Sequence, residues 1–443
     1  MVAFLQRGDV VNSIIKSAGD NLSLSTLCGS GDKCHYSCFY FRSKTFSNQP
    51  RLIKICMKIL TIDVGTGTQD IFLYDSRLDL ENGFKLIVPS PTMIVHRRLK
   101  EATRLGKSVL LTGVTMGGGP SQWAAEAHAR AGLPIYATPD AARSFNDDLS
   151  AVEEMGIRVI SEDEASHLPD SVLRMELCDL DITAIDRALQ QFGVSVDDLS
   201  TIAVAVFDHG NSPPDYSDRQ FRFDYLDERI RQENRLSAFA FRAEAVPPIM
   251  TRLQAVVTSA RHAGGSLLES VPLVVMDTAP AAVLGATFDP QVRQRQRVLV
   301  ANVGNFHTLA FRLGPSGIEG VFEHHTGLLD LPKLEELLRA LADGSLKHAD
   351  VFGDHGHGAL IYNPDPLPFS SDGFGVVVTG PRRNLMRASS LRPYFAVPFG
   401  DMMIAGCFGL LAATADVLPE LGEPIRASLS GAGGSGTPPW EID

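Results

Sequence analysis

This 443-residue chain has few cysteines, no long apolar run and no excess of positive charge. Four of the six cysteines precede residue 57, so the remainder is typical of a reduced, cytoplasmic protein. No apolar run reaches the roughly 20 residues that a membrane-spanning helix needs. The formal net charge of −12 disfavours nucleic acid as a partner, because binding to phosphate backbones needs a basic face. These absences exclude membrane and nucleic-acid partners and favour a globular protein with a small-molecule or protein substrate.

Residues 1–56 differ from the rest of the chain. They have no regular apolar period, and no apolar segment follows a basic start as it would in a secretory signal. Cys34 and Cys38 have the spacing of half a zinc site, but no second pair accompanies them. Met57 then opens an ordinary strand-like start. We therefore interpret 1–56 as a disordered leader or an over-extension of the reading frame.

An order of elements that occurs twice is the strongest feature of the remaining sequence. The first copy predicts strands at 59–64, 70–74 and 84–88, a helix at 93–105, a strand at 108–111, a helix at 121–131 and a strand at 133–137. The second copy predicts strands at 297–303, 307–313 and 317–323, a helix at 331–342, a strand at 375–379 and a helix at 402–415. Three strands followed by alternating helices and strands are the ribonuclease-H-like order, so we predict a duplicated, two-lobed α/β fold.

These copies set the expected domain boundaries. We predict a first ribonuclease-H-like lobe at 57–140, a mixed α/β insertion or lobe extension at 141–270 and a second lobe at 271–417. Residues 418–443 contain a stretch rich in Gly, Pro, Ser and Thr, which is typical of a flexible tail.

Each copy also carries a small-residue turn between its first two strands. In the first copy, Asp63 precedes the turn that contains Gly65, Thr66 and Thr68. Glycine lets the backbone approach an anion, hydroxyl and N–H groups can hold phosphate oxygens, and a carboxylate can hold Mg²⁺. An ordinary hairpin turn would favour the same small residues. The corresponding turn of the second copy follows Asn302 and contains Gly304, Asn305 and Thr308.

The two turns resemble the phosphate loops of the superfamily that contains actin, the heat-shock chaperone ATPases and the sugar kinases. The resemblance implies an actin-like ATPase fold that binds ATP and Mg²⁺. It also assigns Thr379 and Gly380 to an adenosine motif, and the small-residue segments 277–286 and 405–412 to two helices that cross between the lobes. The superfamily usually has an acidic residue where Asn302 stands. An amide cannot accept a proton from water, so slow ATP hydrolysis is expected.

A second group of polar residues lies at strand ends and in glycine loops. Carboxylates and imidazoles in such loops can converge on one divalent metal, or they can simply face solvent at turns. The candidate ligands of a second divalent metal are Asp208, His209, His324, His325, Asp354, His355 and His357.

Another glycine-rich segment, 113–119, precedes a helix without matching a P-loop or a dinucleotide motif. It is either a tight packing turn or a loop that contacts substrate. Together, these motifs resemble a prokaryotic family labelled as related to the pyruvate formate-lyase activating enzyme. That label implies radical chemistry, but the sequence lacks the Cys-x-x-x-Cys-x-x-Cys motif that would bind the iron–sulfur cluster.

Three functional hypotheses follow. The first is an ATP-dependent phosphotransferase or ATPase, in which Asp63 is the carboxylate on the Mg²⁺ side and Asp208 is a base for an unknown acceptor. The second is a nucleotide-gated switch without rapid turnover, which Asn302 favours. The third is a metal-dependent enzyme that uses the Asp and His loops.

Overall fold

The computed structural model describes residues 57–263, 271–369, 373–431, 433 and 438–442. The chain divides into two units, Met1–Ile55 and Cys56–Asp443. The fold described below is that of the second unit, and the predicted leader lies outside the described residues.

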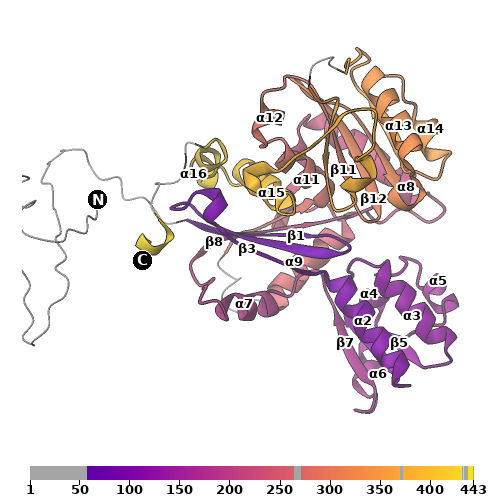
Figure 1. The fold of residues 1–443 in the computed structure, drawn as a ribbon. Helices are drawn as coiled ribbons and strands as arrows, with labels where there is room; N and C mark the ends of the chain where they lie inside the picture. The colour runs from indigo at the N-terminus through magenta and orange to yellow at the C-terminus, as the bar shows by residue number, and fades with distance from the viewer. Residues whose placement is uncertain (1–56, 264–270, 370–372, 432, 434–437, 443) are drawn as a thin grey trace, which may run out of the picture. The chain divides into compact units, whose positions relative to one another are not determined.

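The first sheet has six strands in the order β3-β2-β1-β8-β10-β9 (Figure 1). Its antiparallel meander comprises β1 (Lys58–Val64), β2 (Thr68–Asp75) and β3 (Phe84–Pro89). Next to β1 lie two parallel strands, β8 (Leu199–Val206) and β10 (Leu273–Asp277). The short strand β9 (Ala240–Arg242) closes the edge in the antiparallel direction. Without β9, this is the ribonuclease-H-like sheet.

The second sheet repeats this order as β14-β13-β12-β11-β15-β16. Its meander comprises β11 (Val298–Val303), β12 (His307–Gly314) and β13 (Gly317–His325). Its parallel strands are β15 (Val376–Thr379) and β16 (Pro393–Phe395), and β14 (Gly358–Ile361) extends the meander edge. The repeated order confirms the predicted duplicated ribonuclease-H-like fold with two lobes.

A third, all-parallel sheet forms an inserted domain between β3 and β8. Its strands are β4 (Val109–Gly113), β5 (Ile135–Ala137), β6 (Arg158–Val159) and β7 (Leu173–Leu177). Its helices are α2 (Pro91–Arg104), α3 (Pro120–Arg130), α4 (Pro139–Ala142), α5 (Leu149–Glu154) and α6 (Glu162–Ser166). A hydrophobic cluster of its own holds the domain together.

The inserted domain corrects the predicted boundary of the first lobe at residue 140. The strands expected at 108–111 and 133–137 are real, but they pair with each other rather than with β1. The fourth and fifth strands of the lobe are β8 and β10, which lie in the predicted insertion or just after it. Local alternation of strands and helices does not reveal which sheet a strand joins, and this is why the boundary was misplaced.

Two small-residue helices pack closely between the lobes. They are α11 (Thr278–Ala286) and α15 (Ala405–Val417). A Cβ atom on Gly409 would lie 1.8 Å from the carbonyl oxygen of Ala281, so only glycine permits this approach. This packing agrees with the pair of crossing helices implied by the resemblance. Helix α16 (Pro419–Leu429) packs on α15, so the predicted flexible tail at 418–443 begins with an ordered helix.

Six further α-helices lie outside the inserted domain in the part of the chain that the structure describes. They are α7 (Ile182–Gln190), α8 (Asp218–Gln232), α9 (Thr251–Ala263), α12 (Pro290–Arg293), α13 (Leu331–Asp343) and α14 (His348–Phe352). Of these, α8, α9, α13 and α14 contact strands of the two main sheets. The predicted amphipathic helix is α13, and its buried leucines join the core of the second lobe.

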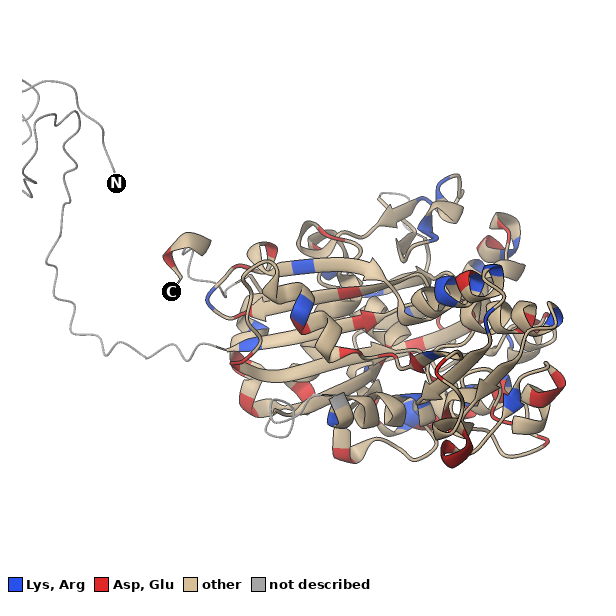
Figure 2. Ribbon diagram, turned by 90° about the horizontal axis from the view of Figure 1, so that it is seen from below, with Lys and Arg blue, Asp and Glu red and all other residues tan. Residues whose placement is uncertain are grey.

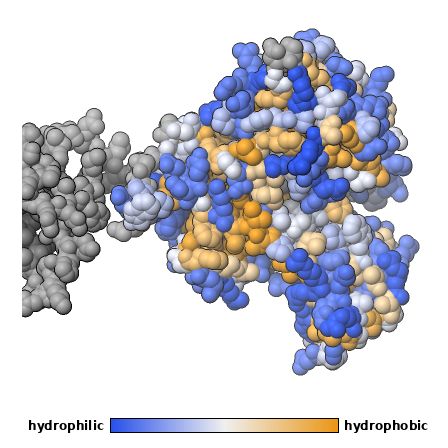
Figure 3. All heavy atoms as spheres, in the orientation of Figure 1, coloured by the Kyte–Doolittle hydropathy of each residue, from blue (hydrophilic) through white to orange (hydrophobic). Residues whose placement is uncertain are grey.

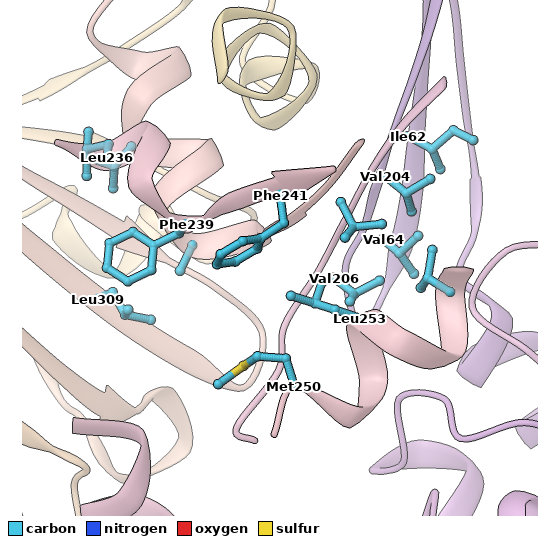
Figure 4. Packing of buried hydrophobic residues seen from close by; sticks show 14 of the residues in the cluster. Ile62, Val64, Val204, Val206, Leu236, Phe239, Phe241, Met250, Leu253 and Leu309 are labelled. Carbon is cyan, nitrogen blue, oxygen red and sulfur yellow. The ribbon is translucent and has the colours of Figure 1, made fainter. Parts of the chain in front are cut away.

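One hydrophobic cluster runs from the first lobe into the second. Figure 4 shows Val204 and Val206 of β8 packed with residues of β1 and α9, and Leu309 of the second lobe belongs to the same cluster. Burial of apolar surface at about 25 cal/mol per Å² therefore favours keeping the two lobes in contact.

The surface agrees with the composition. In the view of Figure 2, Lys and Arg are interspersed with Asp and Glu along the described elements. Figure 3 shows apolar side chains gathered around β3, where Ile87 is exposed and Phe84 contacts the exposed ring of Phe192. Among the helices of the described residues, none combines the length and the apolar character needed to cross a membrane.

Candidate functional site

The two predicted phosphate loops have the same backbone geometry. In the first, the N–H of Gly65 donates to the carbonyl of Thr68 at 2.9 Å, and in the second the N–H of Gly304 donates to the carbonyl of His307 at 3.0 Å. The loops also face each other, because a Cβ atom on Gly67 would lie 2.7 Å from Nδ2 of Asn305. The duplication thus places two equivalent hairpin turns side by side, one from each lobe.

A pocket of about 330 Å³ opens between these turns. It brings together nearly all residues that the sequence predicted for catalysis and nucleotide binding. Those that line it are Asp63, Gly65, Thr66, Thr68, Asp208, Asn302, Gly304, Asn305, Thr379 and Gly380. Thr308 is the exception, because its side chain is buried in β12 and its hydroxyl lies 2.9 Å from that of Thr326. The structure therefore corrects the prediction that Thr308 contacts the nucleotide.

The adenosine motif lies at the end of β15, beside the second loop. Thr379 pairs with Asn302 across the parallel strands. Gly380 has a positive φ of 93°, and a Cβ atom there would lie 2.5 Å from Oδ1 of Asn302. Glycine is therefore required at this turn by both its conformation and its packing.

A pair of buried carboxylates lies on one side of the pocket. Asp63 accepts a hydrogen bond of 2.5 Å from the hydroxyl of Thr278, and it stands opposite Asp70 in the β1–β2 ladder. Burial raises the pKa of Asp63 to about 6, although the Thr278 hydrogen bond opposes the rise. Burial and the charge of Asp63 raise the pKa of Asp70 to about 8. At neutral pH the pair therefore holds about one proton, and a cation could replace it.

Asp70 was absent from the predicted site, although the hairpin register could have revealed it. One oxygen of Asp70 has no hydrogen-bond partner among the described residues, which is costly for a buried polar atom. The pKa of Asp70 in the folded protein lies above its ordinary value. The protonated carboxyl of Asp70 therefore stabilises the folded state fully below about pH 4, and this stabilisation is lost as the pH rises through about 8.

Asp70→Asn is therefore expected to stabilise the metal-free protein, and by about 2–3 kcal/mol more at pH 8 than at pH 5. Denaturant unfolding at the two pH values measures this difference. The exposed Asp79 is the control, since Asp79→Asn should have the same small effect at both. A pH-independent effect of Asp70→Asn would show that Asp70 is ionised throughout.

Asp208 lines the pocket, but the backbone occupies its carboxylate. Its oxygens accept from the N–H of Gly210 at 2.8 Å and from the N–H of Leu253 at 2.9 Å. Burial raises the pKa of Asp208 to about 6, against the effect of these two bonds. In this conformation Asp208 fixes the loop after β8 to the start of α9, and its role as a base remains a prediction.

The inserted domain contributes the glycine-rich segment to the pocket. Residues 115–119 line it, and the N–H of Gly117 donates to a carboxylate oxygen of Asp179. Asp179 in turn forms an ion pair of 2.6 Å with Arg252. Nearby, Trp123 of α3 stacks on Phe306 of the second loop with ring centres 5.5 Å apart. The segment is thus both a packing turn and part of the pocket wall.

The predicted metal ligands converge only in part. His209 and His357 lie in one cluster with His307 and Glu323, and the potential ligand atoms of the four all lie within 4.8 Å of one another. His325 lies beside the cluster, with its ring centre 4.7 Å from that of His357.

The other predicted ligands lie apart from this cluster. His324 follows Glu323 in β13, and because successive side chains of a strand point to opposite faces, His324 points away from the cluster. Its Nε2 lies 3.5 Å from a carboxylate oxygen of Asp354. Asp354 forms an ion pair with Lys333, and His355 is exposed. Asp63 belongs to the carboxylate pair instead. The structure thus brings the three loops together, but it corrects the predicted set of ligands.

The predicted ligand set included neither His307 nor Glu323, although the predicted loops contained the segment 323–327. The signal was present in the β12–β13 register, where His307 pairs with His325 and Leu309 pairs with Glu323. This register puts His307 and Glu323 diagonally on one face, with His307 Nδ1 2.9 Å from Oε1 of Glu323.

A buried arginine connects the cluster to the first lobe. Nε of Arg222 donates to Oε2 of Glu323 at 2.6 Å, and another guanidinium nitrogen donates to Asp277 at 2.8 Å. Burial alone would lower the pKa of Arg222, but the charges of Asp277 and Glu323 outweigh burial and raise it. Burial would likewise raise the pKa of Glu323, and Arg222 is the main reason that it is held well below the ordinary value.

Two ribonuclease-H-like lobes with paired hairpin turns are the fold found in the superfamily of actin, the heat-shock chaperone ATPases and the sugar kinases. The chain belongs to the family described as "Putative pyruvate format-lyase activating enzyme (DUF1786)", whose model matches residues 116–385. A comparison with curated proteins gives no match.

Solved structures match the chain at low identity. The ethanolamine utilization protein EutJ from Carboxydothermus hydrogenoformans is 10% identical, with a TM-score of 0.27 over 79% of this chain and 88% of that one. The ROK hexokinase from Thermus thermophilus is 12% identical, with a TM-score of 0.22 over 85% and 87% of the two chains.

Proposed function

We propose that the pocket binds Mg·ATP, with the phosphates between the two hairpin turns, and that the protein transfers or hydrolyses the terminal phosphoryl group. The observation that most supports this proposal is that two equivalent hairpin turns lie side by side next to the Asp63–Asp70 pair. In each turn, a glycine N–H donates to a carbonyl of the same hairpin. Backbone N–H groups and hydroxyls of such turns are suited to phosphate oxygens.

Each part of the pocket has a role in this proposal. Asp63 and Asp70 hold Mg²⁺, directly or through water, because a hard cation prefers carboxylate oxygens and would displace the proton of the pair. Thr66, Thr68 and Asn305 donate to the phosphates from opposite sides, while Gly380 makes room for the nucleoside. Donors and metal fixed in this way would stabilise the charge that develops on the transferred group.

The acceptor is either water or an unidentified small molecule or protein, and we place the reaction in the cytoplasm. The glycine-rich segment 115–119 and Arg143 line the side of the pocket formed by the inserted domain. We propose that an acceptor enters there, opposite the carboxylate pair.

Calorimetric titration with ATP tests the proposal. Wild-type protein should bind ATP with a dissociation constant in the micromolar to low millimolar range when Mg²⁺ is present, and much more weakly with a chelator. Absence of binding at millimolar Mg·ATP would refute it.

A nucleotide-gated switch is a second candidate, favoured by Asn302. Its amide lies at the end of β11, where the superfamily usually has an acid, and the nearby Asp208 is occupied by backbone N–H groups. With no free base at these two positions, bound ATP would be hydrolysed slowly and could signal through lobe closure.

Asn302→Asp is accordingly expected to raise the rate of ATP hydrolysis by about 10- to 100-fold, since a placed general base typically contributes a factor of this size or more. Phosphate release at saturating Mg·ATP measures it. Asn305→Asp is the control, because it adds the same charge to the same pocket but places the carboxylate in the turn rather than at the end of β11. It should therefore not raise the rate of ATP hydrolysis. An unchanged rate in Asn302→Asp would mean that this position does not orient the attacking water.

A further inference from the structure

The cluster of His209, His307, Glu323 and His357 joins the two lobes beside the pocket. His209 follows β8 in the first lobe, whereas the other three come from neighbouring strands of the second: His307 begins β12, Glu323 lies in β13 and His357 directly precedes β14. Glu323 and His357 are fully buried. His209 and His307 also line the pocket, so the cluster forms part of its wall.

The spacing of the nitrogen atoms suits coordination of a metal ion. The Nε2 atoms of His209 and His357 face each other at 3.2 Å. Two imidazole nitrogens bound to one tetrahedral metal at about 2.0–2.1 Å would be about 3.3 Å apart. Oε1 of Glu323 lies 2.9 Å from Nδ1 of His307, and one potential ligand atom from each of the four residues lies within 4.8 Å of the other three.

The hydrogen bonding of the cluster is incomplete. Nδ1 of His357 is buried without a hydrogen-bond partner among the described residues, which is costly for a polar atom.

The groups around the cluster hold its carboxylate in place. Arg222 donates to Oε2 of Glu323, which leaves Oε1 directed at the histidines. An outer partner of this kind fixes the orientation of a ligand and tunes its affinity. Arg222 also donates to Asp277, and the negative charge of Asp277 balances part of the positive charge of the guanidinium beside the site.

We propose that His209, His307, Glu323 and His357 bind one first-row transition-metal ion such as Zn²⁺, which ties the two lobes together at the wall of the pocket. Three imidazoles and one carboxylate suit Zn²⁺, Fe²⁺, Ni²⁺ or Cu²⁺, whereas Mg²⁺ and Ca²⁺ prefer oxygen ligands. This site is distinct from the carboxylate pair and does not depend on the proposed binding of ATP.

Elemental analysis of the full chain, purified without chelator or affinity metal, tests the proposal. Wild type should contain about one transition-metal ion per chain. His209→Ala and His357→Ala should each lower the content at least tenfold. His324→Ala is the matched control, because His324 is also a buried histidine of β13 but lies on the opposite face from Glu323.

Titration of chelator-stripped wild type separates metal binding from folding of the variants. Addition of Co²⁺ should produce the visible absorption of a four- or five-coordinate site, and Zn²⁺ should abolish it and raise the thermal unfolding midpoint. Mg²⁺ should do neither. The proposal would be overturned if wild type showed no Co²⁺ absorption and no Zn²⁺-dependent shift of the unfolding midpoint. It would also be overturned if His324→Ala and His357→Ala lost metal equally while near-ultraviolet circular dichroism showed both variants to be folded. Since no nucleotide is present, these outcomes are independent of the proposed ATP site.

Discussion

Asp63→Ala should weaken Mg·ATP binding and slow turnover more than about a hundredfold, a loss of roughly 3 kcal/mol. Asp63 is the last residue but one of β1, beside the pocket, and its carboxylate is buried next to Asp70. A magnesium ion held between these carboxylates and the phosphates would lose a ligand, and the remaining carboxyl would revert towards its protonated form. Calorimetry for binding and phosphate release for turnover measure the two losses.

The design isolates the metal from other effects of the substitution. The loss should disappear when Mg²⁺ is chelated, because the role of Asp63 is to hold the cation. Asp79→Ala removes an exposed carboxylate from the same lobe and should change affinity by less than about 1 kcal/mol. Asp63→Asn keeps the shape of the side chain and should resemble Asp63→Ala. Equal affinities for wild type and the Asp63 variants would contradict the assignment.

Arg222→Met should destabilise the metal-free protein by about 3–5 kcal/mol. Arg222 is fully buried and compensates Asp277 of the first lobe and Glu323 of the second. Its removal leaves two buried carboxylates unpaired, and their desolvation is then uncompensated. The cost should fall as the pH is lowered, because protonation neutralises the two acids.

A surface pair on the same helix supplies the comparison. Arg231 is exposed and forms an ion pair with Asp227, so Arg231→Met should cost less than about 1 kcal/mol. Adding Glu323→Gln to Arg222→Met should recover part of the stability, because it removes one of the unpaired charges. Denaturant unfolding that gives similar losses for Arg222→Met and Arg231→Met would show that the buried network contributes little.

The sequence was sufficient to predict the duplicated fold because its signal is local. Both meanders consist of neighbouring strands joined by short turns, and their apolar runs are visible without long-range information. By contrast, β8 and β10 join the first sheet only after the inserted domain has been completed. The strands at 108–111 and 133–137 have the same local pattern as lobe strands, so only their pairing partners distinguish them.

The site was predictable to a similar degree. The turns at Gly65 and Gly304 were found because glycine and hydroxyl residues mark them in the sequence. Asp70 and His307 were missed because their positions depend on cross-strand register, which places Asp70 opposite Asp63 and His307 diagonal to Glu323. Conversely, Thr308 was expected to contact nucleotide from its place in the motif, but its side chain points into the core.

A crystal structure of the protein grown with Mg²⁺ and a non-hydrolysable ATP analogue tests the central claim most directly. We predict that the phosphates lie between 65–68 and 304–307, with Mg²⁺ beside Asp63 and Asp70 and the nucleoside next to Gly380. A nucleotide bound elsewhere, or an empty pocket at millimolar analogue, would contradict it.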